Sequence, residues 1–143
     1  MTLHRRPLGR GRFVAAVSAI LMLAGSVLPW FRAGGSDGIP PLEGNAFEGP
    51  GIIVFLAALA TLALVALPYA AGDRPVALDR WWAYAIVAIV AAVALVVRVV
   101  AIASEAGGLA TMLPDRAPGL WLTAAGVVGL FFAVAEIYGQ RRE

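Results

Sequence analysis

The sequence predicts an all-α fold, an integral membrane four-helix antiparallel bundle that forms a single domain over residues 1–143. Composition supports this, because hydrophobic residues make up 61% of the chain and charged residues only 14%, against about 25% charged residues in typical soluble domains. Four apolar runs also have the length of roughly 20 residues that a helix needs to cross a bilayer. Arginine and tryptophan residues gather at the ends of these runs, as they do beside membrane spans.

The expected spans cover about residues 13–31, 51–70, 81–103 and 119–138, with connecting loops at 32–50 and 104–118. At about 1.5 Å per residue, the first run is roughly 28 Å long, close to the hydrocarbon thickness of a membrane. Glycine and proline are dense in the 32–50 loop, and this density predicts neither helix nor regular strand there.

The first apolar run follows a basic tail, a pattern also typical of a cleaved signal peptide. The segment 23–26 resembles a lipoprotein signal, but Ser26 stands where the lipidated cysteine would be. The run continues past Ser26 to Phe31, which favours an uncleaved span.

The arginines predict the orientation in the membrane. Eight of them lie in the two tails and in the 72–80 link, whereas the opposite loops hold only Arg32 and Arg116. By the positive-inside rule, both termini and the 72–80 link are cytoplasmic, in a bacterial inner (plasma) membrane. Aromatic residues at the run ends indicate the same boundaries through an interfacial belt. These residues are Trp30, Tyr69, Trp81, Trp82, Tyr84, Trp121 and Tyr138.

Several classes of function are disfavoured by composition. The chain has no cysteine and a single histidine, His4, so thiolate metal sites, cysteine nucleophiles and a Ser-His-Asp triad are not expected. We therefore expect no cofactor and no enzymatic activity. The net charge of +2 comes from arginines beside spans and predicts no nucleic-acid partner. The expected partners are the lipid bilayer and either a second copy of the chain or another membrane protein.

Arg98 is the most informative charged residue because it interrupts the third apolar run about 9 Å from its middle. The simpler interpretation is that its side chain snorkels to the headgroups. The functional interpretation is that it faces the bundle and pairs with a carboxylate, forming an anion-binding pocket. Glu105 lies on the same helical face, and Glu43, Glu48 or Asp115 could fold over it from the loops.

Glu136 lies near the end of the fourth run. It is expected at the inner headgroup level, paired with Arg141 or with the 74–80 link. A proton-relay role would require partners deeper in the membrane.

Small residues on the fourth run form a small-xxx-small pattern at Ala125, Gly129 and Ala133, with Gly126 alongside. Such residues let helix backbones approach closely in lipid. We expect an internal packing seam here, with a dimer face as the alternative.

A set of glycine, proline and tryptophan positions resembles small four-span membrane proteins of actinobacteria and related phyla. It comprises the segment Gly25-Ser26-Val27-Leu28-Pro29-Trp30, then Gly44, Gly49 and Gly51, and finally Gly119-Leu120-Trp121. The resemblance implies a topology and no activity, and it transfers no catalytic or binding residue.

The leading functional hypothesis is a structural or accessory membrane protein that acts through helix packing and its outer loops. The alternative is an oligomeric small transporter or ligand-binding membrane protein that uses Arg98 near the outer face. A membrane enzyme ranks third, because the sequence places no nucleophile, base and metal ligand together.

Reporter fusions test the orientation. Fusions at residues 75 and 143 should report a cytoplasmic location, and a fusion at residue 40 should report an external one, because arginine-rich segments stay in the cytoplasm. A cytoplasmic signal from residue 40 would contradict the predicted topology.

Overall fold

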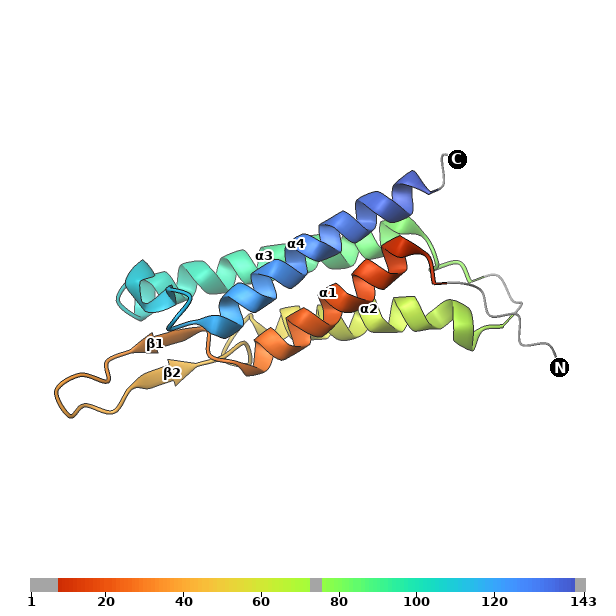
Figure 1. Ribbon diagram of the computed structural model, residues 1–143. Helices are drawn as coiled ribbons and strands as arrows, with labels where there is room; N and C mark the ends of the chain where they lie inside the picture. Colours follow the sequence, from red (N-terminus) through yellow and green to blue (C-terminus); the bar gives the residue numbers. More distant parts are fainter. Residues whose placement is uncertain (1–7, 73–75, 141–143) are drawn as a thin grey trace.

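The computed structural model describes residues 8–72 and 76–140, and in this part of the chain four long helices form a bundle (Figure 1). The helices are α1 (Arg10–Val27), α2 (Ile52–Ala70), α3 (Trp81–Glu105) and α4 (Pro118–Gly139). Each is long and apolar enough to cross a membrane. The prediction of an all-α membrane bundle is therefore confirmed. The shorter elements are strands β1 (Phe31–Ala33) and β2 (Leu42–Gly44) and the 3₁₀ helix η1 (Leu109–Met112).

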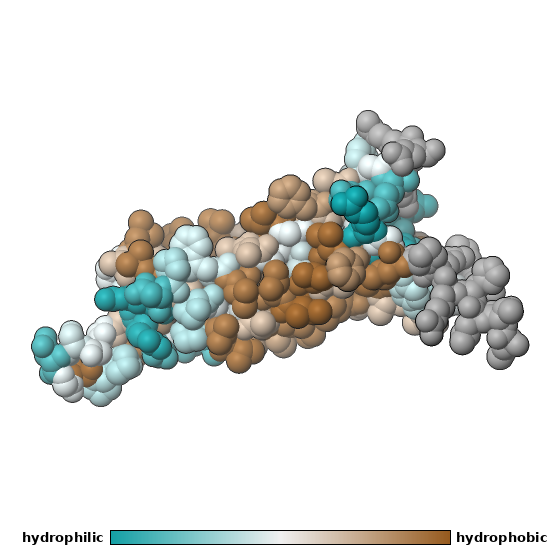
Figure 2. Space-filling view, in the orientation of Figure 1, coloured by the Kyte–Doolittle hydropathy of each residue, from teal (hydrophilic) through white to brown (hydrophobic). Residues whose placement is uncertain are grey.

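The helices pack in a closed ring, with each helix beside its neighbour in the chain and α1 against α4. Because they alternate in direction, the hairpin β1–β2 and η1 lie at one end of the bundle, here called the hairpin end (Figure 1). Arg12 and Asp79 lie at the other, here called the Arg12 end. Figure 2 shows apolar surface along the middle of the molecule and hydrophilic residues towards both ends, as a membrane-spanning bundle requires.

The first helix ends at Val27, so the predicted extension of this span to Phe31 is wrong. Pro29 explains the early end, because a residue before proline is held out of the helical region, and Leu28 is extended at φ −76° and ψ 159°. The following Trp30 is fully buried, and its indole nitrogen donates a hydrogen bond of 2.9 Å to the Gly25 carbonyl. The prediction that Trp30 belongs to the interfacial belt is also wrong.

Another predicted belt residue, Tyr84, is only 1% exposed. Trp82, Trp121 and Tyr138 are exposed, at 38%, 53% and 40%, and can reach the interface. Near the Arg12 end, the Trp81 ring contacts the Tyr138 ring edge to face, with centroids 5.2 Å apart.

The 32–50 loop contains a β-hairpin, contrary to the prediction of no regular strand. Strands β1 and β2 are antiparallel, with Arg32 opposite Glu43, and these two side chains form an ion pair of 2.6 Å. Between the strands, Gly34, Gly35 and Gly38 adopt positive φ angles, which glycine accepts without steric cost. Glycine therefore makes the turn, and three residues on each side remain free to pair.

Helices α1 and α4 approach so closely that their backbones touch. A Cβ atom on Gly25 would lie 2.7 Å from the Gly119 carbonyl oxygen, and one on Gly119 would lie 2.5 Å from the Gly25 carbonyl oxygen. Farther along the same α1–α4 contact, towards the Arg12 end, a Cβ atom on Gly126 would lie 2.6 Å from Met22 Cγ. Because carbon atoms do not approach to these distances, glycine is required at each of these positions for the present packing.

The predicted small-residue stripe only partly matches this seam. Gly126 and Ala133 are buried, and a Cβ atom on Gly129 would collide with the Ser18 hydroxyl of α1. Ala125, however, is exposed. Positions spaced by four residues rotate progressively around a helix of 3.6 residues per turn. Ala125 therefore lies outside the face of α4 that packs against α1. The buried positions instead follow a mixed spacing of three and four residues, at Gly119, Thr123, Gly126, Leu130 and Ala133.

Added methyl groups on this seam should destabilise the bundle. Gly25→Ala and Gly119→Ala are each expected to lower the free energy of unfolding by about 1–3 kcal/mol, the usual effect of overpacking. The measurement is thermal unfolding in a maltoside detergent. Gly139→Ala is the matched control, because nothing lies within 4 Å of a Cβ atom there. If Gly25→Ala unfolds at the same temperature as this control, the α1–α4 contact is not as close as described.

Candidate functional site

Arg98 points into the protein and not towards lipid. The residue is only 7% exposed and belongs to the buried stripe of α3 with Ala91, Ala94 and Ile102. The interpretation that Arg98 snorkels to the headgroups is therefore wrong. An ionisable side chain that faces the inside of a membrane bundle is by default a candidate functional group, because its burial is costly.

Arg98 lines a hollow of about 260 Å³ at the hairpin end, here called the Arg98 hollow. Helix α3 contributes one side, both hairpin strands contribute another, and the segment before α2 contributes Glu48. The lining residues are Phe31, Leu42, Glu48, Arg98, Ile102, Glu105 and Ala106. The structure thus brings together three residues singled out from the sequence, Arg98, Glu48 and Glu105.

The Arg98 guanidinium is buried but poorly paired. Its Nη2 atom lies 3.8 Å from Oε2 of Glu48, which is too long for a hydrogen bond. Its Nε atom is buried and donates to no group among the described residues. The Glu48 side chain is itself 58% exposed, so water weakens the ion pair. The guanidinium therefore finds no hydrogen-bond acceptor in the described part of the protein, and its buried Nε–H group is left unsatisfied.

Glu105 is not the direct partner that its helical face predicts. Within residues 8–72 and 76–140 its carboxylate forms no ion pair with Arg98. Seven residues correspond to about 10.5 Å along a helix, so a shared face does not bring the two charged groups into contact. Glu43 is also unavailable to Arg98, because it pairs with Arg32.

Glycines bring Glu48 to Arg98. Gly49 has φ 86°, and a Cβ atom there would lie 3.5 Å from Arg98 Nη1. A Cβ atom on Gly44 would collide with the Glu48 carboxylate. On the far side of Glu48, a Cβ atom on Gly51 would lie 2.9 Å from the Ala46 backbone. Three glycines, Gly44, Gly49 and Gly51, therefore shape this site.

Glu136 lies at the Arg12 end, away from the Arg98 hollow. It is exposed and lines a second hollow with Arg10 and Gln140. No ion pair of Glu136 occurs in the described part of the chain. Of the expected partners, Arg141 and Arg74 lie outside the described residues, and Arg80, the arginine of the 74–80 link that is described, forms no ion pair with Glu136. Glu136 and Arg98 stand at opposite ends of the bundle and cannot form one site.

An ion pair between Arg12 and Asp79 joins α1 to the start of α3 and was missed by the sequence reasoning. The two residues are 67 positions apart, and no local pattern marks them as partners. Both side chains are partly buried. The pair thus ties two helices together at the Arg12 end.

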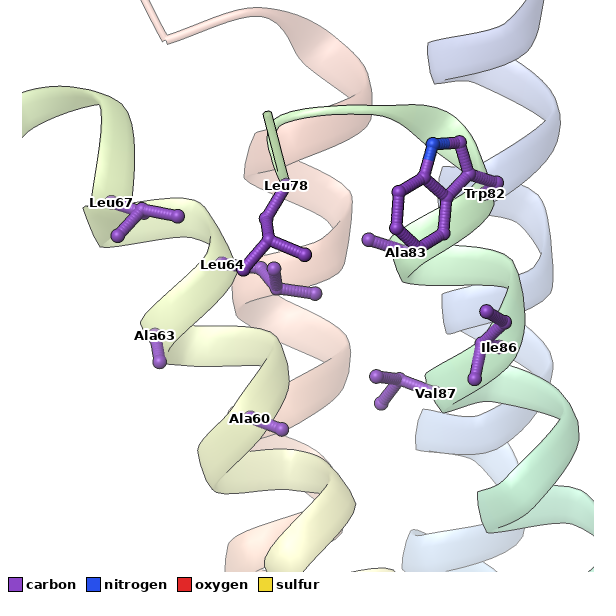
Figure 3. Close-up of a pocket in the computed structure, with 9 residues that line it drawn as sticks. All are labelled: Ala60, Ala63, Leu64, Leu67, Leu78, Trp82, Ala83, Ile86 and Val87. Atoms are coloured by element: carbon purple, nitrogen blue, oxygen red, sulfur yellow. The ribbon is translucent and has the colours of Figure 1, made fainter. Parts of the chain in front are cut away.

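An apolar groove lies between α2 and α3 near the Arg12 end, with a volume of about 410 Å³ (Figure 3). Leu78 from the link lies over α2 near Leu64, and Trp82 and Ile86 form the α3 side (Figure 3). The groove has no charged side chain in its lining. It can therefore contact hydrocarbon chains, but it contains no group that could bind a charged ligand or act in catalysis.

Among the described residues, no group of three or more histidine, cysteine, aspartate or glutamate residues could hold a metal ion. No protein-family model, curated protein or solved structure matches this chain. The Arg98 hollow is therefore the candidate site on its geometry alone.

Replacing Arg98 with leucine tests how the guanidinium is paired. In a maltoside detergent without added lipid, Arg98→Leu should leave the unfolding temperature unchanged or raise it, because hydrophobic replacement of a poorly satisfied buried charge is often neutral or stabilising. A double-mutant cycle of Arg98→Leu with Glu48→Gln should give a coupling of about 0.5 kcal/mol, the low end for contacting groups. The cycle with Glu105→Gln should give less. A large loss of stability in Arg98→Leu alone would identify the arginine as a structural tie.

Proposed function

We propose that the chain is a non-catalytic accessory protein of the cell membrane, which acts through its packed helices and the hairpin between α1 and α2. In this proposal both termini are cytoplasmic and the hairpin end is outside. The arginines support this orientation: Arg10, Arg12 and Arg80 lie at the Arg12 end, whereas Arg32 and Arg116 lie at the hairpin end. Positive charge concentrates on the cytoplasmic side of membrane proteins.

The observation that carries the proposal is a firmly attached hairpin with apolar side chains away from its base. The hairpin extends beyond the helices (Figure 1). At its base Trp30 is fully buried and its backbone nitrogen donates to the Gly44 carbonyl at 2.7 Å. Farther out, Ile39 and Leu42 are 66% and 64% exposed. Apolar side chains on an ordered, projecting element are typical of interaction surfaces.

The helices themselves give little support to transport. The buried polar side chains of the described residues are Ser18, Ser26, Thr61, Arg98, Thr111 and Thr123. Ser26 and Thr61 donate to carbonyls of their own helices, those of Met22 and Ala57. These groups do not form a connected polar path along the bundle. The ligand-binding form of the alternative hypothesis is better supported, because Arg98 is buried beside a hollow.

Photocrosslinking from the hairpin tests the accessory role. A photoreactive residue at Ile39 should give a discrete adduct with a membrane protein or a second copy of the chain in intact cells. The same residue at Ser36, a polar exposed position of the hairpin, should give a weaker adduct, and at Val93, an exposed position in the middle of α3, it should label lipid. Crosslinked bands are resolved by electrophoresis and identified by mass spectrometry.

Two outcomes would contradict the accessory role. If Ile39 labels only lipid, as Val93 does, the hairpin lies on the membrane surface and presents no protein-binding face. If Ile39 gives no adduct in cells where Val93 does, the hairpin has no stable partner.

A further inference from the structure

We propose that the Arg98 hollow binds the headgroup of a zwitterionic phospholipid of the phosphoethanolamine class. In this arrangement the phosphate lies against the Arg98 guanidinium and the ammonium lies against Glu48 and Glu105. The inference deepens the ligand-binding alternative above and is independent of the hairpin partner.

The first part of the argument is the unsatisfied guanidinium. The Arg98 side chain is 8% exposed, and within residues 8–72 and 76–140 its Nε atom has no hydrogen-bond partner and its one ion contact is 3.8 Å long. Burying a charge without good pairing costs free energy. An anion that accepts hydrogen bonds from the guanidinium would offset part of this cost, and this gain would contribute to its binding. The planar fork of arginine matches a phosphate through two parallel hydrogen bonds.

The second part is the sign of the neighbouring charges. Glu48 and Glu105 line the same hollow, so Arg98 and the two carboxylates together carry a net charge of −1. A simple anion near Arg98 would be repelled by these carboxylates. A ligand with both a phosphate and a primary ammonium group satisfies all three side chains, because the ammonium donates hydrogen bonds that the carboxylates accept.

The third part is the position of the hollow. Arg98 lies about 9 Å from the middle of its apolar run, which is about 6 Å short of the edge of a hydrocarbon layer roughly 30 Å thick, whereas Glu105, about 10 Å farther along α3, lies beyond that edge if α3 spans the bilayer. The remaining walls of the hollow are apolar, with Phe31, Leu42 and Ile102 beside the charges. This combination of charge and apolar surface fits the boundary between headgroup and acyl chain, and membrane lipid is present there at high local concentration.

Lipid titration with native mass spectrometry of the full chain in detergent tests the proposal. The probes are dioleoyl phosphatidylethanolamine and dioleoyl phosphatidylglycerol, which share acyl chains and phosphate but differ in the ammonium group. The parent should bind one phosphatidylethanolamine about ten-fold more tightly than phosphatidylglycerol, the difference expected for one charge-assisted hydrogen bond. Arg98→Leu should weaken binding of both lipids about ten-fold or more for the same reason.

The double variant Glu48→Gln/Glu105→Gln gives the more specific readout. Without the carboxylates, the preference for phosphatidylethanolamine should disappear or reverse, while binding through phosphate and Arg98 persists. Matched controls are Glu43→Gln, which removes a carboxylate of the hairpin outside the hollow, and Arg116→Leu, which removes an exposed arginine at the same end. Both should keep the lipid preference of the parent.

Three outcomes would overturn the proposal. Equal affinity of the parent for both lipids would remove the role of the carboxylates. An unchanged lipid preference in the Glu48→Gln/Glu105→Gln variant would also show that the carboxylates do not select the lipid. This variant still tests the proposal if Arg98→Leu fails to fold. Displacement of the lipid by an equal concentration of soluble glycerophosphoethanolamine would show a site for a free zwitterion. None of these results bears on the hairpin crosslink from Ile39, so the two proposals can fail separately.

Discussion

The structure depends first on the close backbone contact between α1 and α4. A side chain at Gly25 or Gly119 would collide with the carbonyl of the other glycine, so two absent side chains set the distance between the helices. At the same level the Gly119 nitrogen donates to the Pro29 carbonyl at 2.9 Å. In a membrane, where apolar surface gains little by leaving lipid, contacts of this kind supply much of the association between helices. They also fix the point at which the chain leaves α1.

The charged site follows from that exit point. Because α1 ends beside α4, the Trp30 side chain turns inward and hydrogen-bonds to Gly25, and its backbone pairs with Gly44. The hairpin is thereby fixed above the bundle, and the glycine-rich return towards α2 brings Glu48 to within 3.8 Å of Arg98. The position of Glu48 beside the Arg98 guanidinium on α3 thus depends on contacts between α1 and α4. A change on the α1–α4 seam should therefore alter the Arg98 hollow even though it touches none of its residues.

The features that the sequence predicts correctly are those set by local composition. The length of an apolar run decides whether it can cross a membrane, so the four helices could be predicted well. The pairing of Arg32 with Glu43 and the approach of Glu48 to Arg98 depend on turn geometry, which glycine leaves open. The inward orientation of Arg98 could have been predicted from the sequence of α3. On α3 the buried stripe is mostly alanine, at Ala88, Ala91 and Ala94, whereas the exposed positions are mostly valine and isoleucine. Arg98 continues the alanine stripe, and this signal places it inside.

The arrangement around Arg98 is difficult to explain by stability alone. A leucine at this position would fill apolar space without leaving donors unpaired, and buried ion pairs often contribute less than hydrophobic replacements. Glu48 relieves little of the cost, because its carboxylate is mostly in solvent and too far away to accept a hydrogen bond. Water in the hollow would satisfy the guanidinium equally well without two carboxylates in the lining. Charges of both signs around one apolar hollow at a helix end are the pattern expected where a protein holds a molecule that carries both signs itself.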